Sequence, residues 1–152
     1  LKANYIICGS VKSNNYTEST HKKIKKIQWI SSFRPGGKPV FYLDKKYSYE
    51  KWTTISIAKS LEVINNFCEK KGLELEILFS FDLDEELEFY KNILKDKKFS
   101  FKKRVSEYST YDNISDEAII AGLNSTILRE TFSRKYRTAF FSIRSHIVAG
   151  FP

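Results

Sequence analysis

Short apolar runs that alternate with segments of helical period constrain this chain more than any other feature. The runs are IQWISSF at 27–33, LELEILFSF at 73–81, AIIAGL at 118–123 and TAFFSI at 138–143. Runs that are apolar on both faces suit strands covered by helices on both sides, and such strands pair in parallel. The sequence therefore predicts an α/β domain, doubly wound around a mainly parallel sheet. YIICGSV at 5–11 and the alternating FSFKKR at 99–104 predict two further strands, the second near a sheet edge.

Helices are predicted between these runs. The residues from Ser48 to Lys71 have helical period, and Gly72 stands where a left-handed residue ends a helix. Asp82 followed by Glu85 resembles a capping box and opens a second helix, a polar loop follows at 106–116, and a short helix is expected from Ser125 to Lys135. The apolar stripe of the first helix comprises Trp52, Ile55, Ala58, Leu61, Ile64 and Cys68, and Phe67 widens it.

Length and composition define the class of protein. A chain of 152 residues that is 41% hydrophobic, with 6 Gly and 3 Pro, suits one globular domain and excludes disordered and collagen-like classes. No uncharged apolar run approaches the roughly 18 residues of a membrane-spanning helix, and the first residues given lack the basic-then-apolar layout of a secretory signal. The chain begins at Leu1, lacks Met and stops at Pro152. We therefore expect residues 1–152 to form a single domain that is a fragment of a longer two-domain protein.

The charge favours anionic partners. Lys and Arg number 26 against 18 Asp and Glu, a net charge of +8, gathered in groups at 22–26, 97–104 and 129–137. Two interpretations stay open: solvated faces, or a surface for phosphates or an anionic membrane. Nucleic acid is not expected as a partner, because the aromatic residues lie inside apolar strands rather than on a basic face. Cys8 and Cys68 lack metal-ligand spacing, so they suit a reducing compartment and no metal is expected.

Candidate binding residues follow the strands, because open α/β sheets bind ligands beyond the carboxyl ends of their strands. These positions carry small hydroxyl, amide and cationic groups, without His, Cys or an acidic pair, which favours phosphate binding over hydrolysis or metal chemistry. They are Gly9-Ser10, Ser31 to Arg34, Ser80, Asn124 to Thr126, and Ser142 to Arg144.

The segment AIIAGLNSTILRE at 118–130 is the sharpest candidate. A buried strand runs into Asn124, Ser125 and Thr126, which open a helix whose positive end attracts a phosphate. Glu130 lies a little more than one turn further on, where a carboxylate can accept two ribose hydroxyls. The alternative from residue types alone is an ordinary helix cap followed by a solvated Glu.

The stretch NSTILRETFSRKYRTAFFSIR resembles the Ser-Thr-x-x-x-Glu segment, basic turn and Phe-Phe strand of the C-terminal donor domain of GT-B glycosyltransferases of bacterial surface-carbohydrate biosynthesis. The resemblance is specific over 118–144 and loose elsewhere. It implies a Rossmann-like lobe that binds a nucleotide-sugar donor. The implied donor-binding residues are Ser125 and Thr126 for phosphate, at the helix that Asn124 opens, Glu130 for ribose, Gly9 and Ser10 as a second phosphate contact, and Arg144 without an assigned role.

The same resemblance implies that donor binding and catalysis are divided between two lobes of the enzyme. Retaining members often carry a second Glu eight positions before the ribose-binding one, where this chain has Gly122, so an inverting, metal-independent transfer is expected. The general base would come from an N-terminal lobe that also binds the carbohydrate or lipid-linked acceptor, which leaves no catalytic residue and little activity in this fragment. The nucleotide-sugar is a substrate, so no cofactor is expected. The implied location is cytoplasmic, peripheral on the inner face of the bacterial membrane.

One departure and one alternative remain. Family members commonly carry Ala and Gly in the turn after the Glu, whereas this chain has TFSRKY at 131–136. The alternative function is a non-enzymatic α/β module that binds a phosphate or nucleotide at the same helix.

Overall fold

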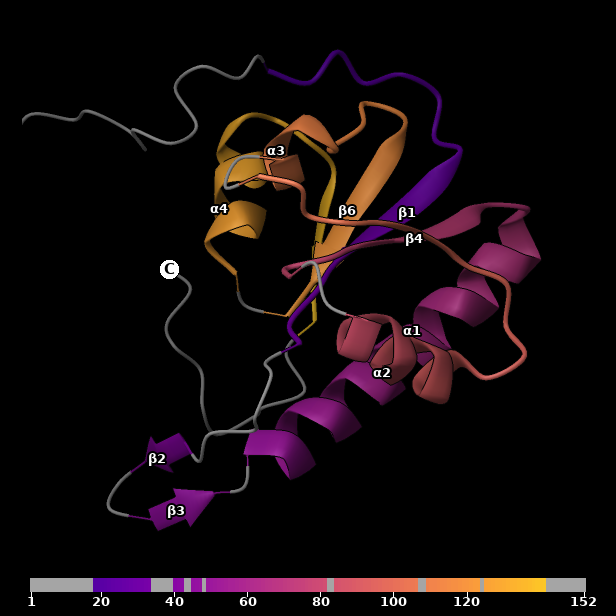
Figure 1. Cartoon of the computed structure of the whole chain (residues 1–152). Coiled ribbons are helices and arrows are strands. Elements are labelled where there is room, and N and C mark those ends of the chain that lie inside the picture. The colour runs from indigo at the N-terminus through magenta and orange to yellow at the C-terminus, as the bar shows by residue number, and fades with distance from the viewer. Residues whose placement is uncertain are drawn as a thin grey trace, which may run out of the picture.

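The computed structural model describes residues 18–33, 40–42, 45–47, 49–81, 84–106, 109–123 and 125–141. Its centre is a five-stranded sheet in the order β5-β4-β1-β6-β7, in which every neighbouring pair is parallel (Figure 1). The predicted doubly wound, Rossmann-like α/β class is therefore confirmed. The strands are β1 (Lys26–Ile30), β4 (Glu74–Leu78), β5 (Ser100–Lys102), β6 (Ala118–Gly122) and β7 (Thr138–Phe140).

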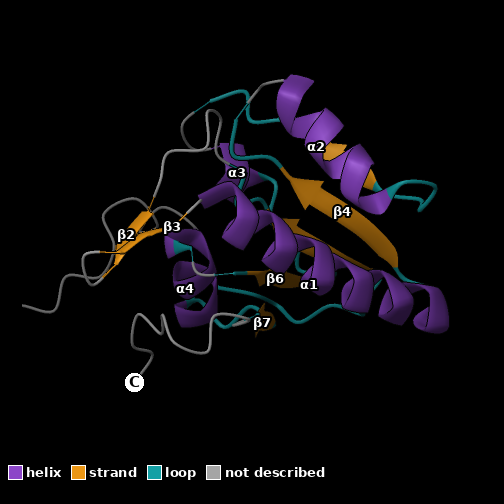
Figure 2. Cartoon of the chain, turned by 90° about the horizontal axis from the view of Figure 1, so that it is seen from below, coloured by secondary structure: helices purple, strands orange, loops and turns teal. Residues whose placement is uncertain are grey.

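Helices cover both faces of the sheet (Figures 1 and 2). One face packs against α1 (Tyr49–Lys71) and α2 (Asp84–Leu94), and the other against α3 (Ser109–Asp112) and α4 (Thr126–Ser133). Because side chains alternate along a strand, Trp29 belongs to the core under α1 and α2, whereas Ile30 belongs to the smaller core with Leu128 of α4. In the described part of the chain, no helix is both long and apolar enough to cross a bilayer.

Most predicted elements are confirmed within a few residues. The structure adds two features: a hairpin of β2 (Val40–Tyr42) and β3 (Lys45–Tyr47), separate from the main sheet, and α3, inside the expected polar loop at 106–116. Ser109, Thr110 and Tyr111 of α3 are buried, and the Ser109 hydroxyl accepts the N–H groups of Val105 and Ser106 at the start of this turn. The strand predicted at 5–11 lies outside the described residues.

The buried face of α1 differs from the predicted apolar stripe at two positions. Phe67 does not widen the buried stripe of α1, since 42% of it is exposed, whereas Ile57 is fully buried. The face of α1 that meets the sheet is therefore rotated toward Ile57. The predicted helix end is confirmed, because Gly72 has a φ of +63°.

Candidate functional site

The strand order creates a switch point between β1 and β6. From β1 the chain continues through α1 to β4 on one side, whereas from β6 it continues through α4 to β7 on the other. The two connections leave the sheet toward opposite faces, and ligands of open α/β sheets bind outside the carboxyl ends of such strands. At the switch point, the carboxyl edge of the sheet is formed by residues 31–33 after β1 and by Leu123, Ser125 and Thr126 after β6.

The β6–α4 junction is close-packed at its start and capped at its end. A Cβ at Gly122 would lie 3.4 Å from the Ile30 Cβ and 3.7 Å from a Leu128 methyl, so this glycine lets β1, β6 and α4 approach closely. Ser125 is extended (φ −124°, ψ 151°), and its Oγ accepts the Leu128 N–H at 3.2 Å. Ser125 is half-buried and Thr126 is exposed. The positive end of α4 therefore opens at the switch point beside two hydroxyl side chains.

Glu130 lies deeper in α4 than a solvated helical Glu. It is buried, and its Oε2 accepts a hydrogen bond from the hydroxyl of Tyr111 on α3. The ordinary solvated Glu of the alternative interpretation is therefore wrong for this residue. Its role toward a ribose stays a prediction, as do the phosphate roles of Ser125 and Thr126. The other predicted donor-binding residues, Gly9, Ser10, Asn124 and Arg144, lie outside the described residues.

A buried carboxylate at the same edge was not among the predicted site residues. Glu86 of α2 is fully buried, and it accepts hydrogen bonds from the backbone N–H groups of Ser80 (3.0 Å) and Phe81 (2.8 Å) and from the hydroxyl of Ser31. The Tyr90 hydroxyl donates to Ser31 Oγ at 2.9 Å. This cluster ties the carboxyl ends of β1 and β4 to the first turn of α2.

The electrostatics of this cluster follow from burial. Desolvation raises the pKa of Glu86 above its ordinary value, against the lowering effect of its hydrogen bonds, and it raises the pKa of Tyr90 in the same way. The predicted capping box named Glu85, which is exposed. The signal that identifies Glu86 is its spacing, because Glu86, Tyr90 and Leu94 recur every four residues and are the buried positions of α2.

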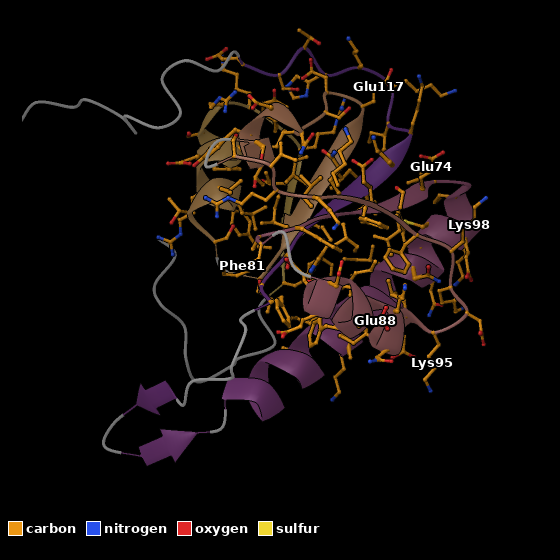
Figure 3. The ribbon with its side chains drawn as sticks, in the orientation of Figure 1. Glu74, Phe81, Glu88, Lys95, Lys98 and Glu117 are labelled. Carbon is orange, nitrogen blue, oxygen red and sulfur yellow. The ribbon has the colours of Figure 1, made fainter. Side chains whose placement is uncertain are left out.

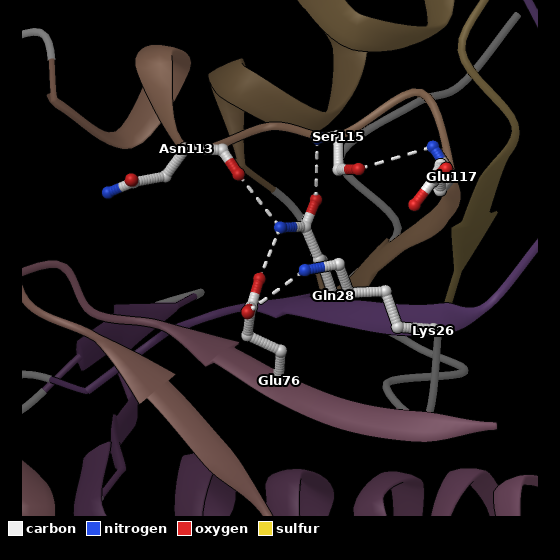
Figure 4. Close-up of polar contacts among 6 residues, drawn as sticks. All are labelled: Lys26, Gln28, Glu76, Asn113, Ser115 and Glu117. Carbon is white, nitrogen blue, oxygen red and sulfur yellow. Dashed lines mark hydrogen bonds and ion pairs between the residues drawn. The ribbon is translucent and has the colours of Figure 1, made fainter.

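A second polar cluster lies on the opposite face of the sheet (Figure 4). The amide nitrogen of the fully buried Gln28 donates to Glu76 at 2.5 Å and to the Asn113 carbonyl at 2.8 Å, and its oxygen accepts the Ser115 N–H at 2.9 Å. Lys26 forms an ion pair with Glu76 at 3.1 Å. These contacts fasten the segment between α3 and β6 over β1 and β4. The buried side chains of Gln28 and Glu76 are bonded within the protein, so we assign the cluster a structural role.

Other candidate sites carry less chemistry. Within the described residues, no group of three or more His, Cys, Asp or Glu side chains could hold a metal ion. A hollow of about 410 Å³ lies between the end of α1 and the starts of β4 and β5, with Cys68 and Phe99 in its lining. It is at the amino edge of the sheet, away from the switch point.

Comparison with known proteins gives one finding. Neither the curated proteins nor the solved structures searched contain a match to this chain. The sequence model of one protein family matches residues 1–151, and this family is described as "putative O-antigen biosynthesis protein". A match over almost the whole chain shows membership of this family. The chain therefore belongs to this family of O-antigen biosynthesis proteins.

Proposed function

We propose that this chain is the donor-binding lobe of a glycosyltransferase in O-antigen biosynthesis, and that the donor's phosphates bind at the N-terminus of α4. The observation that carries the proposal is the Ser125-capped start of this helix at the switch point between β1 and β6. The family description supports a carbohydrate pathway, and the resemblance of residues 118–144 supports a nucleotide-sugar donor.

The proposed chemistry is electrostatic. Free N–H groups at the start of α4 and the Thr126 hydroxyl would hold the phosphates, and the helix dipole would stabilise the negative charge that the leaving nucleotide gains. The Tyr111 hydroxyl would orient the Glu130 carboxylate toward the ribose. Transfer would invert the sugar, with the acceptor and the general base supplied by another lobe. The isolated chain would then bind donor and catalyse little.

A charge placed at the helix cap provides the sharpest test. In Ser125→Asp the carboxylate still caps α4, so stability should stay within about 0.5 kcal/mol of wild type. The same carboxylate repels phosphate, so affinity for a nucleoside diphosphate, measured by calorimetry, should fall at least about tenfold, or about 1.4 kcal/mol. Asn66→Asp adds an equal charge on the exposed side of α1 and should leave the affinity unchanged. Equal affinities in all three proteins would refute the site.

The buried position of Glu130 favours a second candidate, a module that binds phosphate without contacting a ribose. In the donor-binding proposal, Glu130→Gln weakens a nucleoside diphosphate more than inorganic pyrophosphate, because only the nucleotide carries a ribose. In the alternative, both ligands respond equally. Tyr111→Phe removes the neighbouring hydroxyl and shows how far loss of orientation alone accounts for the effect. Sugar transfer by the intact protein, followed with labelled donor, separates an enzyme from a binding module.

A further inference from the structure

Among the described residues, positive charge gathers at the amino edge of the sheet. The segments that lead into the five strands there carry twelve Lys and Arg against six Asp and Glu. The described segments that follow the strands at the carboxyl edge carry two Lys and Arg against three Asp and Glu; they are 31–33, 79–81, 84–86, 103–106, 123, 125–126 and 141. The amino-edge segments are 18–26, 69–74, 95–99, 116–117 and 134–137.

The fold, rather than the sequence, brings these cations together. Arg137 donates to the backbone carbonyls of His21 and Lys22 at 2.9 Å each, which joins the first and third cationic groups of the sequence. Figure 3 shows Glu117, Glu74 and Lys98 along this edge, with Phe81 at the opposite end of the strands. Neighbouring strands lie about 4.8 Å apart, so the edge extends for roughly 20 Å.

Helix capping accounts for only part of this charge. Lys70 and Lys71 complement the negative end of α1, as basic residues commonly do. Lys22, Lys23 and Lys98 lie in exposed segments that lead into strands, where no helix dipole requires them. Some charge is balanced locally, since Lys25 pairs with Glu117 at 2.9 Å. Lys26, one of the twelve cations, pairs with Glu76 outside these segments, so the edge keeps an excess of five positive charges.

We propose that this amino edge docks on an anionic lipid bilayer. Ten of its twelve cations are Lys, which act as mobile point charges and suit a diffuse anionic surface better than the bidentate readout that Arg provides. Its aromatic side chains, Phe99 and Tyr136, are partly buried against the two cores, so they offer no stacking platform for the bases of RNA. Docking in this orientation leaves the carboxyl edge and the β6–α4 junction open to the aqueous phase. The inference does not depend on donor binding.

Vesicle sedimentation tests the proposal. The 152-residue chain should bind phosphatidylcholine vesicles that contain phosphatidylglycerol, should not bind pure phosphatidylcholine, and should be released in 1 M salt, where the screening length is about 3 Å. Lys23→Gln with Lys98→Gln should weaken binding roughly 30-fold, because each Lys near the surface contributes about 1 kcal/mol. The matched control, Lys59→Gln with Lys102→Gln, removes the same charge from exposed positions on α1 and at the end of β5, and should weaken it much less.

Three results would overturn the assignment. Equal weakening by both double variants would mean that net charge, not this edge, governs binding. Failure to sediment with anionic vesicles would remove the membrane as partner. Tighter binding to single-stranded RNA than to the vesicles at the same salt concentration would assign the edge to nucleic acid. Nucleotide affinity, measured in the same variants, should be unchanged, so failure here is distinguishable from failure of the donor site.

Discussion

Removal of the Glu86 carboxylate should be among the most damaging single changes in this fold. Glu86→Ala leaves the backbone N–H groups of Ser80 and Phe81, now bonded at 3.0 and 2.8 Å, and the Ser31 hydroxyl without their acceptor. A buried donor left unpaired costs about 1–3 kcal/mol. Two backbone donors give about 2–6 kcal/mol, and the desolvation that Glu86 no longer suffers lowers this sum, so the expected loss in the free energy of unfolding is roughly 2–4 kcal/mol.

Urea denaturation followed by circular dichroism measures this loss. Glu86→Gln keeps the shape and one acceptor oxygen but places an amide nitrogen against a backbone donor, so it should cost about 1–3 kcal/mol. The control is Glu88→Ala, two residues along the same helix, which removes an exposed ion pair with Lys91 and should cost less than about 0.5 kcal/mol. If Glu86→Ala costs no more than the control, the cluster does not hold the edge together.

The pH dependence of stability independently tests the direction of the pKa shift of Glu86. Burial raises the pKa of Glu86 above its ordinary value of 4.5, so between the two values the folded state binds more protons than the unfolded state. The stability contributed by this group is complete below pH 4.5 and is lost as the pH rises through the folded-state pKa. The advantage of wild type over Glu86→Gln should therefore shrink with rising pH. An advantage that grows would mean that hydrogen bonding outweighs burial and that the pKa is lowered.

Three further predictions concern other parts of the fold. Gly72→Ala should cost about 1–2 kcal/mol in unfolding free energy, because the φ of +63° is strained for any side chain, and Gly72→Asn should cost less. In the Cys8→Ser variant, the thiol of Cys68 should resist alkylation at pH 8 until denaturant is added, since burial raises its pKa to about 11 and leaves roughly one thiolate in a thousand. Gln28→Ala should lower the thermal midpoint and cost about 2–4 kcal/mol, because the Asn113 carbonyl, the Ser115 N–H and one oxygen of the Glu76 carboxylate lose their partner, while the other Glu76 oxygen keeps its ion pair with Lys26.

The sheet and its long helix were predictable because parallel pairing leaves a strong mark on sequence. A strand covered on both faces must be apolar almost throughout, and β6 is, whereas α1 shows its period over 23 residues. The exceptions lie in β1 and β4, where Gln28 and Glu76 occupy buried positions. Gln28 bonds to the segment before β6 and to Glu76, and Glu76 bonds to Gln28 and Lys26. Each partner of Glu76 and of Gln28 lies far away along the chain, so no local pattern identifies them.

The candidate site was predictable only in part, since local signals do not specify which side chains turn inward. Ser125 followed a cap pattern, and the structure confirms it as the cap of α4. The capping-box spacing selected Glu85 over Glu86, yet the rotation of α2 against the sheet decides which of the two is buried. The contact between Tyr111 and Glu130 likewise depends on how α3 packs. Tertiary packing, which neither the capping box nor the helix-cap pattern specifies, decides that Glu86 and Glu130 are buried.

The buried cluster around Glu86 also supports the proposal that the ligand site lies on the β6 side of the switch point. After β1, Ser31 is buried and bonded to Glu86 and Tyr90, so its hydroxyl is committed to the protein. After β6, Ser125 is half-buried and Thr126 exposed, beside the positive end of α4. One half of the edge is thus tied down by internal hydrogen bonds, and the other half presents hydroxyl groups to the surroundings. A rigid frame beside an accessible helix start is the arrangement that phosphate recognition requires.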